Sequence, residues 1–261
     1  MGKEATIWEH LEELIIRLRK ALIVFAIATL IVPFIPVSLA SYTPLLYVVP
    51  RVLLDYVVPE TLEVGGHVIE VKLTAESPFA GLRILMYSAV LIGFLVSSPY
   101  IAYQIYAFIE PALYPHEKRW VKLGGAVAVV LFLLGVSVAL LVVLPFTYRV
   151  MFILSATVAA DRLVSYASLE DILSSAILIT LATGVAFEVP LIIFILIYAG
   201  VIEVPSLTGN VMRALLLASA VVAALVSPDP SGVGMILLLI PYYALIVVAV
   251  ILAKFLKGRR A

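Results

Sequence analysis

The chain has 261 residues, of which 64% are apolar and only 13% are charged, with 17 Lys plus Arg against 17 Asp plus Glu. Soluble domains average about 45–50% apolar and about 25% charged residues, so these proportions exclude an ordinary water-soluble protein and indicate a membrane-embedded bundle. A net charge of zero without a basic block argues against nucleic acid as a partner, and the lack of cysteine excludes disulfides and thiol chemistry.

The N-terminal residues 1–20 predict an amphipathic helix. Thr6 and Glu9 have the spacing of a capping box, which marks a helix start. After them, apolar residues recur at helical spacing from Ile7 to Leu18, while the acidic residues lie largely on another face. We expect this helix to lie on the cytoplasmic membrane surface and to lead into the first span.

Long stretches without charge predict the membrane spans. About 20 apolar helical residues cross a hydrocarbon core of about 30 Å. The stretch 172–202 is interrupted only by Glu188, and 214–227 is short unless 207–212 extend it. The sequence therefore predicts an all-α integral membrane protein with six transmembrane helices, the last two of them short. The expected spans cover 21–50, 84–109, 123–148, 172–202, 214–227 (with 207–212 as a possible extension) and 230–253.

The distribution of positive charge predicts how these spans are oriented. Six spans place both termini on one side, and that side would carry twelve Lys and Arg residues against five on the other. Under the positive-inside rule, both termini are cytoplasmic. The chain is then a single membrane domain with a first extracytoplasmic loop at 41–77, a first cytoplasmic loop at 110–122 and a second extracytoplasmic loop at 150–171.

The two outer loops contain local signals of their own. In the first, apolar residues over 45–56 predict a short helix on the outer face, and residues 62–73 alternate around Gly65-Gly66 as a β-hairpin does. The second loop is polar in places and has room for another short helix. No internal repeat typical of inverted-repeat transporters is present.

Prolines within or near the spans predict bent helices. Each proline removes a backbone donor, so the helix curves or is repaired by its neighbours, and bent helices can enclose the concave face of a cupped bundle. Simple curvature is a sufficient reason for them, and a gating hinge is the alternative. The residues are Pro33, Pro36, Pro99, Pro145, Pro190 and Pro241.

Glu188 is the acid placed deep in an apolar stretch. An ionised group at mid-bilayer costs roughly 2.5–3.5 kcal/mol, so such a residue usually faces a polar partner or a cavity. A functional role is one reading, and a protonated carboxyl bonded to a neighbouring helix is the other.

Enzymatic chemistry finds little support. His10, His67 and His116 fall on three segments outside the spans and have no metal-ligand spacing, so we expect no metal and no cofactor. A serine protease would need a histidine inside the membrane, and an aspartyl protease would need two acids in one site, whereas Glu188 and Asp229 belong to different segments. Glu13 and Glu117 lie at the cytoplasmic face, where pairing with neighbouring cations would also explain them.

Several motifs together resemble the TatC family, the multispanning subunit of the twin-arginine protein translocase. The N-terminal His10-Leu11-Glu12-Glu13-Leu14 with Arg17 is similar to the family's first signature, and the stretch from Ser98-Pro99-Tyr100 to His116-Glu117-Lys118-Arg119 is similar to its most distinctive one. Shorter patches agree in order along the chain. They are Ser77-Pro78-Phe79, Phe187-Glu188-Val189-Pro190 and Ser227-Pro228-Asp229-Pro230.

The resemblance implies a receptor for folded proteins whose signal peptides carry two adjacent arginines. These folded proteins would be moved across the cytoplasmic membrane with the proton-motive force. Glu13 and Glu117 would bind the arginine pair, with Glu12 a neighbouring candidate. A guanidinium fork suits a carboxylate bidentately, which a lysine cannot reproduce. The family further implies surface roles for four residues around these acids and for Phe79 and Asp229 in the outer loops. The four are His10, Leu14, Phe108 and Tyr114.

The implied partners are membrane lipid, further copies of the chain and single-span subunits of the TatA/TatB type, which Glu188 would meet within the membrane. Two other functions stay open on the residues alone. A proton-coupled small-solute transporter would use Glu188, and an intramembrane hydrolase would need a nucleophile and a base within reach of each other.

Overall fold

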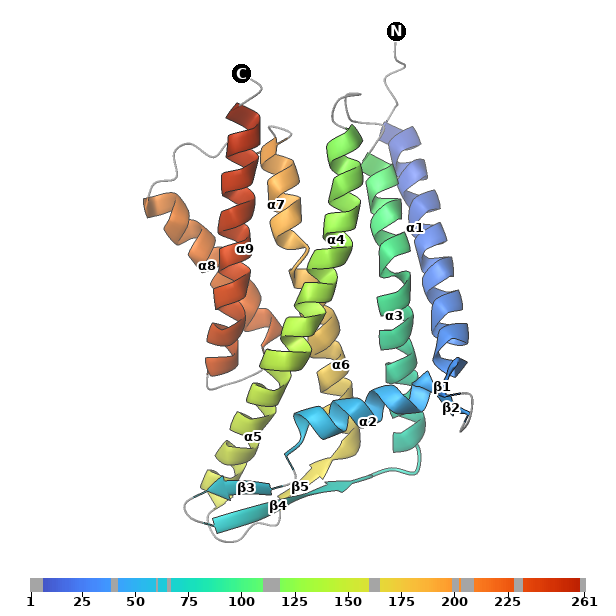
Figure 1. Cartoon of the computed structure of the whole chain (residues 1–261), viewed down its shortest axis with the longest axis vertical. Helices are drawn as coiled ribbons and strands as arrows, with labels where there is room; N and C mark the ends of the chain where they lie inside the picture. The colour runs from blue at the N-terminus through green and yellow to red at the C-terminus, as the bar shows by residue number, and fades with distance from the viewer. Residues whose placement is uncertain are drawn as a thin grey trace. The chain divides into compact units, whose positions relative to one another are not determined.

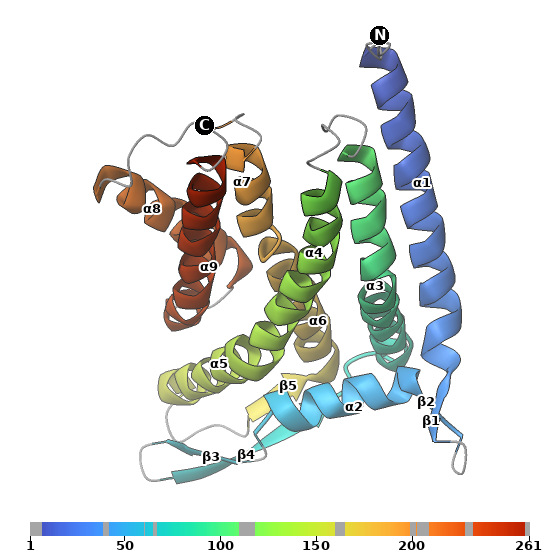
Figure 2. The ribbon, with the colours of Figure 1, turned by 45° about the horizontal axis from the view of Figure 1, so that its top comes forward.

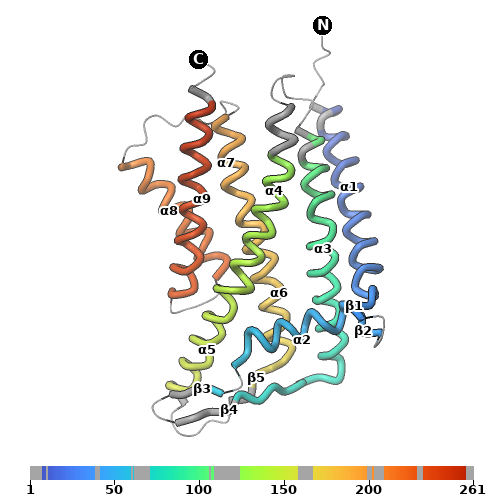
Figure 3. Tube along the Cα trace, viewed as in Figure 1, coloured from blue at the N-terminus to red at the C-terminus, as the bar shows by residue number. Residues whose placement is uncertain are grey.

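The structure, a computed structural model, is almost entirely helical and forms two compact units. Unit 1 comprises Met1–Val49 and Leu85–Val130, and unit 2 comprises Pro50–Ile84 and Leu131–Ala261. Figure 1 shows the elements in chain order, and Figure 3 traces the backbone. The residues described are 7–38, 42–59, 61–64, 67–109, 118–159, 165–198, 202, 209–227 and 232–258.

Unit 1 is built around α1 (Ile7–Ile31), most of α3 (Ala80–Ile109) and the first part of α4 (Lys118–Val138). α1 is one unbroken helix, so the expected amphipathic helix continues directly into the apolar segment. Thr6, the expected capping residue, lies outside the described residues.

The charge-free stretch 21–50 is not one long span, which corrects the sequence expectation. α1 ends at Ile31 and a 3₁₀ turn with Pro33 near its start follows over Val32–Phe34, because proline cannot donate to the preceding turn. Pro36 then begins β1 (Pro36–Ser38), which pairs antiparallel with β2 (Thr43–Pro44).

Unit 2 contains the remaining helices. They are most of α2 (Leu45–Val57), the end of α4, α5 (Leu144–Ala159), α6 (Leu169–Ala186), α7 (Val189–Tyr198), α8 (Gly209–Val226) and α9 (Val233–Gly258). α9 packs along both α7 and α8, and Figure 2 shows the three together from a second direction. The helix predicted over 45–56 is confirmed by α2.

A three-stranded sheet lies at one end of unit 2, away from the end of α9 (Figure 1). β3 (Thr61–Val64) and β4 (His67–Thr74) pair antiparallel from Thr61 opposite Glu70 to Val64 opposite His67, which confirms the predicted hairpin. β5 (Ser165–Ser168) pairs parallel with β4 and was not predicted. The second outer loop therefore holds the end of α5 and a strand among its described residues, not a separate helix.

Five helices of the described chain are long and apolar enough to cross a membrane. They match the second to sixth expected spans, whereas α1 is not among them because charges continue to Lys20 and the helix ends at Ile31. α8, with 18 residues, is short as expected. α9 has 26 residues, about 39 Å at 1.5 Å per residue, so the expectation of a short last span is wrong. The five spans are Ala80–Ile105, Gly124–Thr157, Leu169–Tyr198, Gly209–Val226 and Val233–Leu256.

The prolines act on their helices in different ways. Pro99 and Pro241 lie inside continuous helices. Pro145 follows a five-residue π-helical segment, Ala139–Val143, which joins α4 to α5. A π segment widens the helix and relieves the clash that a proline ring makes with the preceding turn. Phe187 and Glu188 separate α6 from α7, and Pro190 lies in the first turn of α7.

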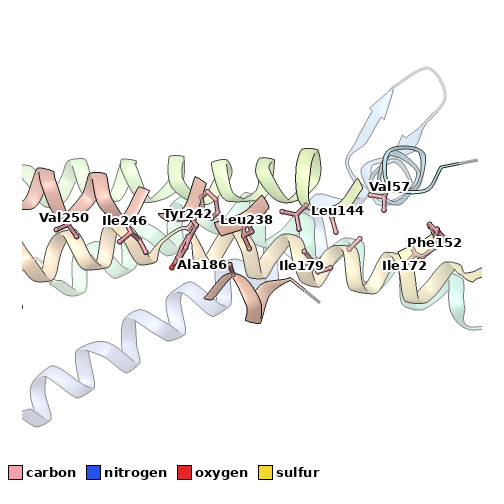
Figure 4. Packing of buried hydrophobic residues seen from close by; sticks show 14 of the residues in the cluster. Val57, Leu144, Phe152, Ile172, Ile179, Ala186, Leu238, Tyr242, Ile246 and Val250 are labelled. Atoms are coloured by element: carbon pink, nitrogen blue, oxygen red, sulfur yellow. The ribbon is translucent and has the colours of Figure 1, made fainter. Parts of the chain in front are cut away.

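Unit 2 has one continuous apolar core along α5, α6, α7 and α9 (Figure 4). Phe187, Leu144 and Val250 are completely buried, and Val57 brings the end of α2 into the same cluster. The ring centroids of Phe187 and Tyr242 are 6.0 Å apart, which places the interruption between α6 and α7 against the middle of α9. This core fixes the position of the segment that carries Glu188.

Candidate functional site

Glu13 is the seventh residue of α1, and its side chain is half-buried. Its Oε1 accepts a hydrogen bond from Nε of Arg17 at 2.9 Å and a second from an Nη2 group of the same guanidinium. The side chains are 31% and 24% exposed, respectively. A guanidinium is therefore already bound to the carboxylate that the sequence motif singled out, and Arg17 is its donor.

The register between α1 and α3 locates the end of α3 relative to Glu13. The two helices lie side by side in opposite directions (Figures 1 and 2), with the rings of Phe25 and Phe94 edge-to-face at 5.9 Å. A Cβ on Gly93 would overlap Thr29, so the helix backbones approach closely there. Glu13 is about 24 Å before Thr29 and Phe108 about 22 Å after Gly93, at 1.5 Å per residue. Both therefore lie at the same level of unit 1.

Not every predicted residue of this surface is described. Leu14 is 41% exposed, Glu12 is exposed and Phe108 is half-buried, while His10 lies within α1. Glu117 and Tyr114 lie outside the described residues, and α4 begins at the next residue after Glu117, Lys118. The structure thus brings Glu13, Leu14 and Phe108 to one end of unit 1.

Glu188 lies at the interruption between α6 and α7 and is half-buried. Its amide donates to the carbonyl of Val185 at 3.0 Å, and its own carbonyl accepts from the amide of Ile192 at 3.1 Å. The backbone of Glu188 is therefore bonded to the last turn of α6 through its amide and to the first turn of α7 through its carbonyl. A carboxylate at the start of α7 is favoured by the partial positive charge of the helix N-terminus, which offsets part of the cost of an acid in this segment.

A close helix contact holds this interruption in place. A Cβ on Gly184 would lie 2.6 Å from Cε2 of Phe132 and 3.1 Å from Cγ2 of Val136, so α6 touches α4 where only glycine fits. Small residues are the usual means by which membrane helices approach each other closely. Glu188 consequently lies four residues after a close contact between α4 and α6.

The sheet end of unit 2 contains an ion pair that the sequence reasoning missed. Arg83, near the start of α3, binds Glu170, in the first turn of α6, through Nε to Oε1 and Nη2 to Oε2. The side chains are 44% and 20% exposed. No local pattern signals this pair because 87 residues separate its members.

The two outer-loop residues expected from the motifs have different outcomes. Phe79 is 66% exposed in the turn before α3, where its amide donates to Oγ of Ser77 at 3.2 Å. Asp229 lies outside the described residues. Among the residues that the structure describes, no three acidic or histidine side chains are grouped as metal ligands are.

Comparison with known proteins gives a consistent result over most of the chain. The family model "Sec-independent protein translocase protein (TatC)" matches residues 9–241. The TatC of Aquifex aeolicus is 33% identical over 194 residues, covering 73% of this chain and 78% of that protein, and the TatC of Carboxydothermus hydrogenoformans is 27% identical over 257 residues, covering 98% and 96%.

Solved structures agree with the sequence comparison. A crystal structure of the twin-arginine translocase receptor TatC superposes with a TM-score of 0.71 at 30% identity, covering 95% of this chain and all of that one. A second TatC crystal structure, in DDM, superposes with a TM-score of 0.70. The chain therefore belongs to the TatC family of Sec-independent protein translocase proteins.

Proposed function

We propose that the end of unit 1 carrying Glu13 is the surface that binds twin-arginine signal peptides, and that Glu117 supplies its second carboxylate. As a member of the TatC family the chain is a membrane component of the twin-arginine protein translocase, a transport protein and not an enzyme. The TatC crystal structure that this chain resembles is named a twin-arginine translocase receptor, which supports a receptor role here.

The observation that carries the proposal is the pair formed by Glu13 and Arg17. The carboxylate accepts two N–H groups of a guanidinium, and both bonds go to Oε1. A carboxylate in this position is thus sterically and chemically suited to an arginine side chain approaching from a peptide. Two acids on separate segments would hold two adjacent arginines at once. Leu14 and Phe108, with His10 and Tyr114, would form the surface around them.

We further propose that the chain lies in the cytoplasmic membrane with both termini and this surface in the cytoplasm. The twelve-to-five distribution of Lys and Arg supports that orientation. α1 then supplies the first of six spans in addition to the five long helices. The apolar part of the signal peptide would lie along the concave side of the bundle during transport driven by the proton-motive force.

Glu188 is proposed to meet a polar group on a single-span subunit of the TatA/TatB type. Its place at a helix interruption leaves the side chain half-buried instead of enclosed, which supports contact with a second protein. A hydrogen bond formed in lipid explains why an acid is retained there. Phe79 and Asp229 would contribute to the outer surface, and further copies of the chain would complete the working complex.

A binding titration with a twin-arginine signal peptide tests the peptide site. We expect Glu13→Gln and Glu117→Gln to weaken binding by about tenfold each, because each removes one charged hydrogen-bonding partner. Glu12→Gln is the comparison variant, since Glu12 is the adjacent, exposed candidate; we expect its binding to be unchanged, and a loss there instead of in Glu13→Gln would assign the role to Glu12. A twin-lysine peptide should bind the wild-type chain more weakly. Unchanged binding in both glutamine variants, with folding intact, would overturn the proposal.

A further inference from the structure

A pocket of about 400 Å³ lies in unit 2, and none of its lining residues belongs to the sites described above. The end of α2, the π-helical segment with the start of α5, and Leu237 of α9 form its walls. Most of its lining is apolar, and its volume falls in the range of small-ligand sites, about 300–1,000 Å³. The pocket therefore has the size and the character of a site for a small amphipathic molecule.

Two opposite charges line the pocket without binding each other. Asp55 of α2 and Arg149 of α5 are both exposed, and neither forms an ion pair with any residue that the structure describes. Exposed carboxylate and guanidinium groups that share a pocket would each gain from a partner of opposite charge. A ligand with one anionic and one cationic group complements this pair.

The position of Arg149 relative to the bilayer restricts the kind of ligand. It lies eight residues before the end of the 34-residue helical span Gly124–Thr157, which is far longer than the about 20 residues that cross a hydrocarbon core. The residues near this end, together with Asp55 and Tyr56, belong to the sheet end of unit 2. Tyrosine and arginine are typical of the headgroup level, where the ring and the long side chain reach polar surroundings.

The apolar walls extend from this level toward the membrane core. Leu141 is 60% exposed and Val142 is 39% exposed on the π-helical segment, so the pocket opens toward lipid on this side. A water-soluble zwitterion would leave these walls uncovered. A lipid would place its chains against them and its headgroup between the two charges.

We propose that this pocket binds an aminophospholipid of the leaflet on the sheet side, with the phosphate at Arg149, the ammonium at Asp55 and an acyl chain along Leu141 and Val142. Charge complementarity selects this occupant over an anionic lipid, which has no group for Asp55. Charge complementarity also selects the aminophospholipid over a hydrophobic helix of a partner protein, because such a helix has no charged group for Arg149 or for Asp55. The site goes beyond the transport role and does not depend on the peptide surface.

The test is native mass spectrometry of the full-length chain, purified in detergent and titrated with phosphatidylethanolamine or phosphatidylglycerol. We expect the wild type to retain phosphatidylethanolamine about three- to fivefold better. Arg149→Gln should lower retention of both lipids by a similar factor, because both have a phosphate. Asp55→Asn should lower only phosphatidylethanolamine, to the level of phosphatidylglycerol.

Arg51→Gln is the matched control, because Arg51 is an exposed cation of α2 that does not line the pocket. Circular dichroism and gel filtration check that each variant is folded. Equal retention of both lipids by the wild type, or retention in Arg149→Gln equal to that in Arg51→Gln, overturns the proposal. A pocket occupied by a partner helix would give this second result. Binding of free phosphoethanolamine as tight as that of the lipid would also overturn it, since the walls would then contribute nothing.

Discussion

A Cβ atom on Gly135 would lie 2.8 Å from Cγ of Phe187 and 2.9 Å from the carbonyl oxygen of Thr183, so α4 packs directly against the C-terminal end of α6 and leaves no room for a side chain. The contact is reciprocal, because Gly184 meets Phe132 and Val136 of α4 in the same way. The side chain of Phe187 is completely buried directly before Glu188. Packing at two glycines thus determines where the acid of this span lies.

Gly135→Ala should destabilise the chain by about 1–3 kcal/mol, because the added methyl group meets a backbone carbonyl as well as a ring and cannot be accommodated by one rotamer change. Thermal unfolding in detergent measures the effect. Gly124→Ala is the control on the same helix, since a Cβ there has nothing within 4 Å and alanine is the better helix former. A Gly135→Ala variant as stable as Gly124→Ala would contradict the packing described.

Arg17→Gln should strengthen binding of a twin-arginine peptide by about twofold. The substitution removes the guanidinium that occupies Glu13, and an i,i+4 pair of this exposure is worth about 0.3–0.5 kcal/mol. The measurement is the peptide titration described above, with Arg19→Gln as a control that removes an exposed cation from the same helix. Weaker binding in Arg17→Gln than in Arg19→Gln would show that Arg17 supports the peptide site instead of competing for it.

The ion pair between Arg83 and Glu170 should contribute about 0.5–1 kcal/mol to stability, a small value because Arg83 is 44% exposed. A double-mutant cycle with Arg83→Gln and Glu170→Gln, followed by thermal unfolding, gives the coupling energy. Arg83→Lys should recover only part of it, since an ammonium cannot make the two parallel bonds. Full recovery by lysine would mean that charge alone matters and the fork geometry does not.

Glu188→Ala should leave capture of the signal peptide unchanged and reduce association with a single-span partner subunit. The substitution removes the carboxyl group at a surface-accessible interruption of the span, far along the chain from Glu13. Co-purification of the partner with the variant measures association, and Glu188→Gln tests whether a neutral hydrogen-bonding group is sufficient. An intact complex with Glu188→Ala would exclude the proposed contact.

Local patterns in the sequence were enough to predict the hairpin, the outer helix α2 and the long helices from α3 onward, because periodicity and turn residues act over a few positions. β5 was not predictable in this way, since four residues form a strand only when β4 is beside them. The end of α1 at Ile31 was missed although Pro33 and Pro36 marked it, because the absence of charge was given more weight than the prolines.

For the candidate site, the motifs pointed to Glu13 and Glu188 but not to their surroundings. Pairing of Glu13 with a neighbouring cation was the alternative reading, and the bond from Arg17 at i,i+4 spacing confirms it. The register that brings Phe108 to the level of Glu13 depends on the contact of Gly93 with Thr29, which only the packed helices reveal. Membership of the TatC family then favours the translocase role over the transporter and hydrolase alternatives that the residues alone left open.

The strand β5 ends at Ser168 and α6 begins at Leu169 without an intervening loop, and Oγ of Ser168 accepts from the amide of Asp171 at 3.4 Å. Pairing of β5 with β4 therefore sets how far α6 is turned about its own axis. Every side chain along α6 inherits that rotation, up to the interruption at Phe187. A register slip in a few strand residues would consequently redirect side chains along the whole of α6, up to the segment that carries Glu188.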